Sequence, residues 1–536
     1  MKVHVEVLLN IFIILSNVLF FTKAEVFTAL VDLGPLLDTG GEIVKTLERY
    51  LKVEEERLEK VKWLRAQYEK LYTSAIQDEE TFLSNPVNAY LLVKRLTSDW
   101  AITNRLIEGA QSKALIENIT QQSFIFPDQE DLRGAASALL RLQDTYLLDT
   151  TQLARGEIDG IKRVFSELSA GDCFMLGHEA LQLNDHFYTV RWMQEALDRL
   201  EREEVKTSNK QSILDYLAYS SFVLGDIEDA VKYTQHLLNI APNHARAQEN
   251  LIYYQNLLNN GDHSKGDEGS PSDDMPKPLK VIKREQIPTF TNYERLCRGE
   301  HIKTPFEQSQ LNCRYTTSNN SYLVLQPVKV EQLSLDPEIV IFHDIISDKD
   351  MELFKDLAVP WLARATVQNP KSGALETASY RVSKSAWLND TVHPRIARAS
   401  QFIKCVTGLE VDTAEELHII NYGIGGHYEP HLDHKREGEV DPFAHIGTGN
   451  RIATWIFYLS DVEAGGATVF PKIGVQVKPK RGTAAFWYNL RKSGDGDMNT
   501  IHAACPVLSG TKWVGNKWLH EKNQEFRRRC SLNRWE

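Results

Sequence analysis

Residues 451–471 read RIATWIFYLSDVEAGGATVFP and decide the fold of the C-terminal part of the chain. Short runs rich in Thr, Val, Ile and aromatic residues are typical of β-strands, and the Gly-Gly pair indicates a turn. Runs of the same texture follow at 475–490 (VQVKPKRGTAAFWYNL) and 511–521 (TKWVGNKWLHE). Several short strands separated by turns predict a barrel or a jelly roll.

The segment before this β region is helical. Residues 217–254, LAYSSFVLGDIEDAVKYTQHLLNIAPNHARAQENLIYY, have the small residues, turn and helix-ending Pro242 of a tetratricopeptide unit. Such units stack into solenoids with a concave groove. The candidate groove carries aromatic residues, namely Tyr216, Tyr219, Phe222 and Tyr253. These rings are either ordinary core residues or a docking surface for polyproline II peptides.

Two further segments organise the chain. Residues 42–72 place apolar residues at mostly three- and four-residue spacings between mixed charges, which predicts an amphipathic helix. Self-association through this helix and ordinary packing within its own domain both remain open. Residues 261–278, GDHSKGDEGSPSDDMPKP, are polar, acidic and rich in Gly, Ser and Pro, and therefore predict a linker.

Composition and the N-terminus exclude several classes of protein. The 61 basic and 73 acidic residues give a net charge of −12, which disfavours nucleic acid and anionic membranes as partners. Lys2, the apolar run 7–21 and the small residues Thr22 and Ala24 predict a signal peptide over residues 1–24, with a signal anchor as the alternative. Since no later stretch approaches 18 apolar residues, the mature chain is expected to have no membrane span.

Entry into the secretory pathway would allow the cysteines to form disulfides and the sequons to be glycosylated. Asn118, Asn319 and Asn389 each begin an Asn-X-Ser/Thr sequon and are candidate glycan acceptors. The six cysteines allow 15 complete pairings, so spacing alone fixes no disulfide. Cys173 lies in a helical apolar pattern, which favours a buried thiol.

The candidate metal site lies in NYGIGGHYEPHLDH, residues 421–434. His431 and Asp433 are two residues apart, so in an extended segment their side chains leave the same face. His502 begins another strand-like segment and completes a two-His, one-carboxylate set, which is typical of non-haem iron, with zinc as the rival. Ten residues later Lys512 lies among apolar residues, where a buried ammonium requires an anionic partner such as a dicarboxylate.

These motifs resemble the α-subunit of collagen prolyl 4-hydroxylase, a family of iron(II)- and 2-oxoglutarate-dependent dioxygenases. The resemblance covers nearly the whole mature chain, including LLRLQDTYLLDT at 139–150, and it is most specific in HAACPVLSGTKWVGNKWLHE at 502–521. It implies a multidomain α+β protein: an N-terminal helical region, a tetratricopeptide-like peptide-binding domain and a C-terminal double-stranded β-helix (jelly roll). The boundaries expected are 1–24, 25–164, 165–260, 261–280 (acidic linker), 281–334 (disulfide-containing connector) and 335–536 (catalytic domain).

The resemblance also assigns roles to residues by position. It implies iron ligation by His431, Asp433 and His502, and contact of Lys512 with the C5 carboxylate of 2-oxoglutarate. Tyr428 matches the tyrosine that hydrogen-bonds the same co-substrate, and Thr468 matches a residue near it. Arg451 and Trp518 match residues lining the peptide channel. The peptide groove it implies comprises Asp215, Tyr216, Tyr219, Arg246, Asn250 and Tyr253. The sequence departs from the family at Leu181 and Phe222, where related chains carry Tyr, so the apolar wall of the groove is kept, with Phe222 as a further candidate, but two hydroxyls are lost. It favours the disulfides Cys297–Cys313 and Cys505–Cys530.

The activity implied is 4-hydroxylation of peptidyl proline in procollagen-like X-Pro-Gly sequences, with O2 consumed and 2-oxoglutarate converted to succinate and CO2. Ascorbate is the implied reductant that restores oxidised iron. The resemblance implies that two α-chains assemble with two copies of protein disulfide isomerase in the lumen of the endoplasmic reticulum. Because the C-terminal SLNRWE is no KDEL-type retention signal, the tail of the isomerase is expected to retain the complex. The alternatives are a dioxygenase acting on another residue or on a non-collagen proline-rich protein, and a non-catalytic adaptor.

Overall fold

The computed structural model describes residues 30–77, 103, 106, 129–158, 167–259, 288–369, 374–444 and 446–536. The chain divides into two compact units, one comprising residues 31–128 and the other the remainder. The signal peptide, the linker at 261–280 and Asn118 lie outside the described residues. Within the described residues, no helix has the length and apolarity needed to cross a membrane.

The first unit is represented mainly by one long helix, α2 (Leu30–Gln77). It contains the amphipathic segment expected at 42–72, so that prediction is confirmed. Leu47, Leu51 and Leu58 are 49–57% exposed along it. Exposed leucines at heptad-like spacing are typical of helices that pair, and self-association through α2 stays a prediction.

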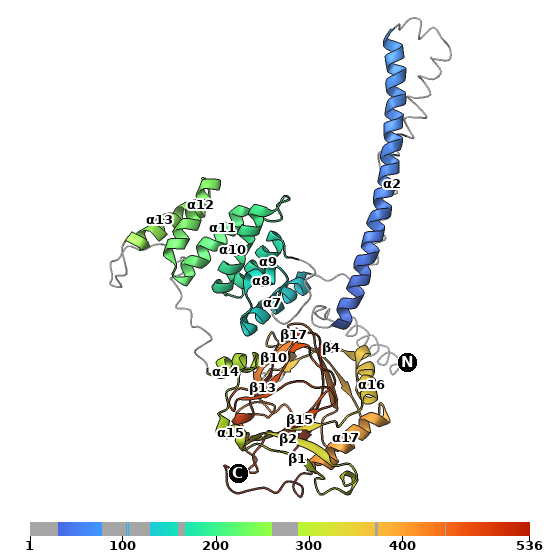
Figure 1. Cartoon of the computed structure of the whole chain (residues 1–536), viewed down its shortest axis with the longest axis vertical. Coiled ribbons are helices and arrows are strands. Elements are labelled where there is room, and N and C mark those ends of the chain that lie inside the picture. The colour runs from blue at the N-terminus through green and yellow to red at the C-terminus, as the bar shows by residue number, and fades with distance from the viewer. Residues whose placement is uncertain are drawn as a thin grey trace, which may run out of the picture. The chain divides into compact units, whose positions relative to one another are not determined.

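The helical part of the second unit is a stack of antiparallel helices (Figure 1). Its members are α7 (Gln129–Tyr146), α8 (Thr150–Ala154), α9 (Ala170–Gln182), α10 (His186–Arg202), α11 (Lys210–Leu224), α12 (Ile227–Ile240) and α13 (Ala245–Asn259). The predicted repeat corresponds to α11 and α12: Gly225 ends α11 in a left-handed conformation (φ 87°), and the Asp226 side chain caps α12. Cys173 is fully buried here, as expected, and burial raises its pKa to about 12.

The β part consists of two antiparallel sheets, which confirms the jelly roll. The larger sheet has the order β1 (Cys313–Thr316), β2 (Val328–Leu335), β3 (Glu338–His343), β15 (Ala484–Tyr488), β11 (Arg451–Tyr458), β18 (Lys512–His520), β9 (Leu417–Tyr422), β8 (Lys384–Leu388) and β4 (Ala363–Arg364). The smaller sheet has the order β14 (Val475–Val477), β13 (Thr468–Phe470), β16 (His502–Ala504), β10 (His427–His431) and β7 (Arg381–Val382). Since β1 and most of β2 lie within 281–334, the predicted connector contributes to the larger sheet.

Short elements complete the β part. They are β5 (Val367–Gln368) paired with β6 (Leu375–Glu376), β12 (Ala464–Gly465) paired with β17 (Val507–Ser509), and helices α14 (Pro288–Cys297), α15 (Pro305–Ser309), α16 (Asp348–Ala358) and α17 (Pro394–Thr407). Helices α16 and α17 pack on the outer face of the larger sheet, where Phe354 and Ile403 share a core with Trp455 of β11. The opposite face of β11 carries Ile456 and Tyr458, which pack between the two sheets. Both faces of β11 are therefore buried.

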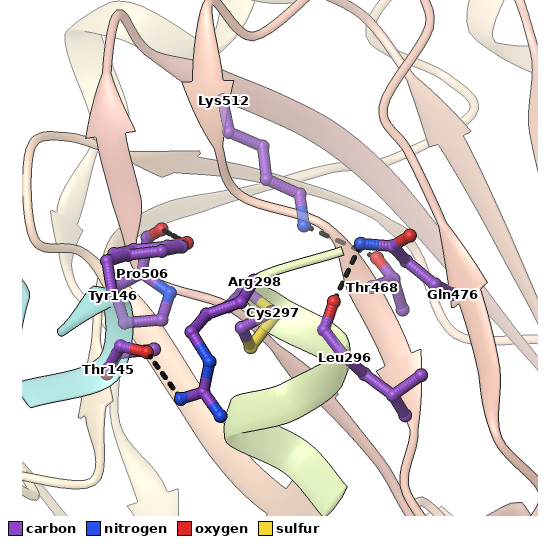
Figure 2. The surroundings of a disulfide bond; sticks show 10 residues. Thr145, Tyr146, Leu296, Cys297, Arg298, Thr468, Gln476, Pro506 and Lys512 are labelled. Carbon is purple, nitrogen blue, oxygen red and sulfur yellow. Dashed lines mark hydrogen bonds between the residues drawn. A yellow bond between two sulfur atoms is a disulfide. The ribbon is translucent and has the colours of Figure 1, made fainter. Parts of the chain in front are cut away.

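The expected disulfide pairing is wrong in the structure. Cys297 is bonded to Cys505, with Cα atoms 5.5 Å apart, instead of to Cys313. Helix α14 packs on β13 and on the chain after β16, so Cys297 at its end meets Cys505 in a buried apolar cluster (Figure 2). Cys313, at the edge strand β1, and Cys530, near the C-terminus, are exposed and form no disulfide among the described residues. Closeness in sequence did not predict closeness in space.

Candidate active site

The three predicted metal ligands converge between the two sheets. His431 ends β10 and lies directly opposite His502 in the antiparallel pairing of β10 with β16. Asp433 follows two residues after the end of β10. Its carboxylate oxygens lie 3.8 Å from His431 Nε2 and 3.6 Å from His502 Nε2. Among the described residues, these three form the one cluster whose donor atoms all lie within 4.8 Å of each other.

Backbone carbonyls orient both imidazoles toward a metal. His431 Nδ1 lies 2.8 Å from Glu429 O, and His502 Nδ1 lies 3.0 Å from Thr500 O. A proton on each Nδ1 satisfies these carbonyls and leaves each Nε2 lone pair directed at the shared centre. Burial lowers the pKa of His431 to about 3, so this ring is neutral at physiological pH. The donor set therefore fits a divalent ion with open coordination positions.

A chain of buried hydrogen bonds holds the carboxylate. Thr454 Oγ1 donates to Asp433 Oδ2 at 2.7 Å, and Asn489 Nδ2 donates to Thr454 Oγ1 at 2.8 Å. Trp487 Nε1 in turn donates to Asn489 Oδ1 at 2.8 Å. Although burial opposes ionisation, the neighbouring histidines and this hydroxyl hold the pKa of Asp433 below its usual range. The carboxylate is thus ionised and fixed before any metal binds.

Lys512 provides the cationic end of the site. It is 1% exposed, and its Nζ donates to Thr468 Oγ1 at 3.3 Å, an oxygen that also accepts from Tyr458 OH at 2.9 Å. No ion pair joins Lys512 to any described residue. Burial lowers the pKa of Lys512 to about 7. The arrangement fits an anionic group delivered by a ligand, since an unpaired buried ammonium is strongly penalised.

The remaining predicted residues of this centre come from both sheets. Thr468 and Tyr428 both lie opposite Ala504 of β16, on either side of it. The Tyr428 ring stacks on His431 with ring centroids 3.5 Å apart. Lys512 belongs to the facing sheet, where it pairs with Tyr422 of β9. The structure thus brings Lys512, Thr468 and Tyr428 to the same space beside the ligand triad, as expected from the sequence.

Arg451 and Trp518 form a wall near the triad. The Arg451 guanidinium lies 3.9 Å from the Trp518 ring centroid and makes two bonds to Glu415, one of 2.5 Å and one of 2.9 Å. Trp518 lies directly opposite Thr454, the residue that holds Asp433. These contacts place both predicted residues on the metal-facing side of the larger sheet.

Sequence reasoning missed the residues that support this wall. His520 Nε2 lies 2.9 Å from Glu415 Oε1, and His520 is fully buried. Although burial alone would raise it, the Arg451 charge and the His520 contact lower the pKa of Glu415 to about 2. His520 had a detectable signal, because it lies two residues after Trp518 in β18 and shares its face. Glu415 had none, since it is one of two adjacent glutamates in the loop before β9.

The predicted peptide groove lies on α11 and α13. Asp215 forms an ion pair with Arg246, and the half-buried rings of Tyr216 and Tyr219 pack against Phe174 and His186 respectively. Asn250 and Tyr253, on α13, are also half-buried. Phe222 differs from the expectation: it is 1% exposed and stacks on Tyr254, so its ring supports the surface from behind instead of lining it.

Three family descriptions match the chain. They are "Prolyl 4-Hydroxylase alpha-subunit, N-terminal region" over residues 29–160, "Prolyl 4-hydroxylase peptide-substrate-binding domain" over 170–260 and "2OG-Fe(II) oxygenase superfamily" over 417–520. Prolyl 4-hydroxylase subunit alpha-1 of Mus musculus is 48% identical over 514 residues, covering 95% of this chain and 96% of its own length. The chain belongs to the prolyl 4-hydroxylase alpha-subunit family.

Other members of the family are similar to this chain over nearly the same length. The Homo sapiens subunit alpha-1 is also 48% identical, with the same coverage of both chains. Subunit alpha-2 of Caenorhabditis elegans is 43% identical over 514 residues, covering 95% of this chain and 94% of its own. The identified oxygenase region contains the ligand triad and Lys512, so the family assignment and the geometry agree on where a 2OG-Fe(II) oxygenase has its centre.

Proposed function

We propose that this chain hydroxylates C4 of peptidyl proline in procollagen-like X-Pro-Gly sequences, using Fe(II), 2-oxoglutarate and O2 and releasing succinate and CO2. The observation that carries the proposal is the pairing of a His431–Asp433–His502 triad with a buried lysine that has no ion-pair partner among the described residues. A zinc hydrolase would use the triad but has no need of that cation.

Each residue of the site has a separate role in this proposal. His431, Asp433 and His502 would hold the metal, which would supply open coordination positions for 2-oxoglutarate and O2. Lys512 and Thr468 bind the far carboxylate of 2-oxoglutarate, so that its keto-acid end is directed at the metal. Tyr428 covers His431 and keeps bulk water from that side. Ascorbate fits as the reductant that returns oxidised iron to Fe(II).

The Arg451–Trp518 wall would orient the peptide. Trp518 is 6% exposed, and its Nε1 has no hydrogen-bond partner among the described residues. A buried donor without a partner is costly, so a peptide carbonyl is a suitable acceptor. Glu415 neutralises Arg451, which allows a neutral proline ring to approach an otherwise charged wall. The groove around Tyr216, Tyr219 and Tyr253 would hold a more distant part of the same proline-rich chain.

Location and assembly extend the proposal. We infer a secretory protein of the endoplasmic reticulum lumen that forms an α2β2 tetramer with protein disulfide isomerase, whose own signal would retain the complex. Asn319 and Asn389 are both exposed, which supports them as glycan acceptors, and Asn389 Nδ2 donates to Glu416 Oε1 at 2.8 Å. Asn118 remains a candidate on sequence alone.

The test is to co-express the chain with the isomerase and measure succinate. Fe(II), 2-oxoglutarate, ascorbate and (Pro-Pro-Gly) repeats should give succinate and 4-hydroxyproline in equal amounts. A matched lysine-containing repeat should give neither, which separates proline from lysine hydroxylation. Recovery of a soluble, fully active monomer from expression of this chain alone would contradict the tetramer, whereas no product with any proline peptide would contradict the activity.

A further inference from the structure

Helix α7 is fixed to the helices of the peptide-binding region. Gln143 is fully buried, donates to Thr150 Oγ1 at 2.8 Å and accepts from Trp192 Nε1 of α10 at 2.8 Å. Ser137 Oγ donates to Glu179 Oε1 of α9 at 2.9 Å. Because buried side-chain bonds of this kind fix relative position, α7 is expected to move together with α9 and α10.

The same helix also touches two loops of the jelly roll. Arg141 Nη1 donates to Gly425 O at 2.8 Å, and Tyr146 OH donates to Pro506 O at 2.6 Å (Figure 2). Ala138 lies so close to Gly425 that a Cβ at position 425 would be 2.6 Å from the Ala138 Cβ. Gly425 also has φ 71°, so two independent reasons require glycine at this contact.

Both loops are joined to the strands that carry the metal ligands. Gly425 lies two residues before β10, which carries Tyr428 and His431, and Pro506 lies two residues after β16, which begins with His502. The loops are bonded to each other, since Gly425 N donates to Val507 O at 2.8 Å and Val507 N donates to Gly426 O at 3.1 Å. A shift of α7 would therefore act on both ligand strands at once.

The Tyr146 contact also lies close to the lysine pocket. Pro506 O accepts from Gly466 N at 3.0 Å as well as from the Tyr146 hydroxyl. A Cβ at Gly466 would lie 3.6 Å from Lys512 Cδ, so the Gly466 backbone borders the lysine side chain. The backbone of Pro506 and Gly466 therefore lies between the Tyr146 hydroxyl and the Lys512 side chain. Figure 2 shows Tyr146, Pro506 and Lys512 around this point.

We infer that Tyr146 and Arg141 are positioning residues through which occupation of the helical peptide groove tightens the binding of 2-oxoglutarate. A bound peptide restrains the helices that hold α7, and α7 then restrains the loops beside β10, β16 and Lys512. If the first ligand already restrains these segments, the second ligand loses less conformational entropy when it binds. The two ligands then bind with positive cooperativity without a large change of shape. This inference rests on the proposed function.

The experiment compares long and short peptides on the assembled full-length protein. A long (Pro-Pro-Gly) repeat occupies both the helical groove and the active site, whereas a single Pro-Pro-Gly unit occupies the active site only. In the unmodified protein the KM for 2-oxoglutarate should be lower with the long peptide. Tyr146→Phe removes one hydrogen bond and should raise that KM on the order of fivefold with the long peptide only, bringing the two values together. Arg141→Met should act in the same direction, and Arg141→Lys should restore part of the difference.

Tyr233→Phe is the matched control. Its hydroxyl donates to Gln194 Oε1 at 2.9 Å, wholly within the helical region, so its loss should leave the long-to-short KM ratio unchanged. Affinity for poly-proline, measured separately, should be unchanged in Tyr146→Phe. A lost ratio together with lost peptide affinity would indicate damage to the groove and would overturn the coupling.

Hydrogen exchange provides a readout that does not depend on turnover. Poly-proline should slow amide exchange over residues 423–431 and 502–507 in the unmodified protein and not in Tyr146→Phe. If neither the KM ratio nor the exchange responds to the variant, the inference is wrong while the proposed function stands. If no proline peptide is hydroxylated, the proposed function fails, and the exchange result alone decides whether α7 couples the two regions.

Discussion

Lys512 offers a test in which binding and stability change in opposite directions. We predict that Lys512→Met raises the KM for 2-oxoglutarate by at least tenfold. A charge-assisted hydrogen bond to a buried carboxylate contributes about 1.5–3 kcal/mol, and each 1.4 kcal/mol corresponds to about a factor of ten. Methionine keeps the length and the apolar stem of lysine, so the loss of the charge is the main change.

The pH dependence follows from the lowered pKa of Lys512. With a pKa of about 7 in the ligand-free protein, the ammonium is half-deprotonated at neutral pH. The carboxylate binds the protonated form, so the KM for 2-oxoglutarate should rise about tenfold from pH 6 to pH 8. Stability should change the other way: between pH 7 and about pH 10 the unfolded chain binds the proton more tightly than the folded chain, so the ligand-free protein becomes more stable as pH rises.

The assay is urea unfolding of the ligand-free assembly at pH 7 and pH 10, alongside steady-state kinetics. A pKa lowered from 10.5 to about 7 corresponds to about 5 kcal/mol of folding free energy, which Lys512→Met should recover at pH 7. Lys517→Met is the matched control, since Lys517 is 3% exposed on the same strand but pairs with Asp390 at 3.3 Å. If Lys512→Met leaves the KM unchanged, or Lys517→Met alone changes it, the reasoning is refuted.

Three further predictions concern the metal, the groove and the wall. His502→Ala should reduce Co(II) binding, followed by its visible absorption, and abolish turnover while circular dichroism keeps the helical signal; retained hydroxylation would refute the ligand assignment. Tyr219→Ala in the full-length assembly should weaken poly-proline binding by at least threefold in fluorescence titration, since a half-buried aromatic contact is lost; unchanged affinity would make Tyr219 a plain core residue. Glu415→Gln should destabilise the protein by about 3 kcal/mol at pH 7, because a charge partner of Arg451 is lost. The depressed pKa of Glu415 contributes stability that is complete above about pH 5 and declines as pH falls toward 2, so acid unfolding of the variant should start from a lower stability and be less steep.

The sequence predicted the site better than it predicted the scaffold. His431, Asp433 and His502 lie in short motifs whose spacing reflects strand geometry, and the structure brings their donor atoms within 4.8 Å of one another. Lys512 is buried against Thr468 of the sheet that carries both histidines. The disulfide was mispredicted because the packing of α14 on β13 depends on contacts far apart in sequence. Glu415 escaped notice for the same reason, since it meets Arg451 and His520 only in the folded sheet.

Burial was harder to predict than strand type. Phe222 has the three-residue spacing of Tyr216 and Tyr219, yet the structure places it inside, because the rotation of α11 brings it against Tyr254 of α13. Helical periodicity gives the face of a helix, whereas neighbouring helices decide which part of that face remains accessible. The apolar run of β11 had a similar ambiguity, since both faces of this strand are covered.

The charges of the proposed active site balance only when every component is present. Fe(II) would contribute two positive charges and Lys512 one, while Asp433 contributes one negative charge and 2-oxoglutarate two. Arg451 and Glu415 already neutralise each other. A keto acid with a single carboxylate would leave a net positive charge in a site where Lys512 and Asp433 are both nearly inaccessible to water, and low-dielectric surroundings make that costly. A buried lysine at position 512 would therefore favour a dicarboxylate over a keto acid with a single carboxylate, because the second carboxylate offsets the cost of the buried ammonium.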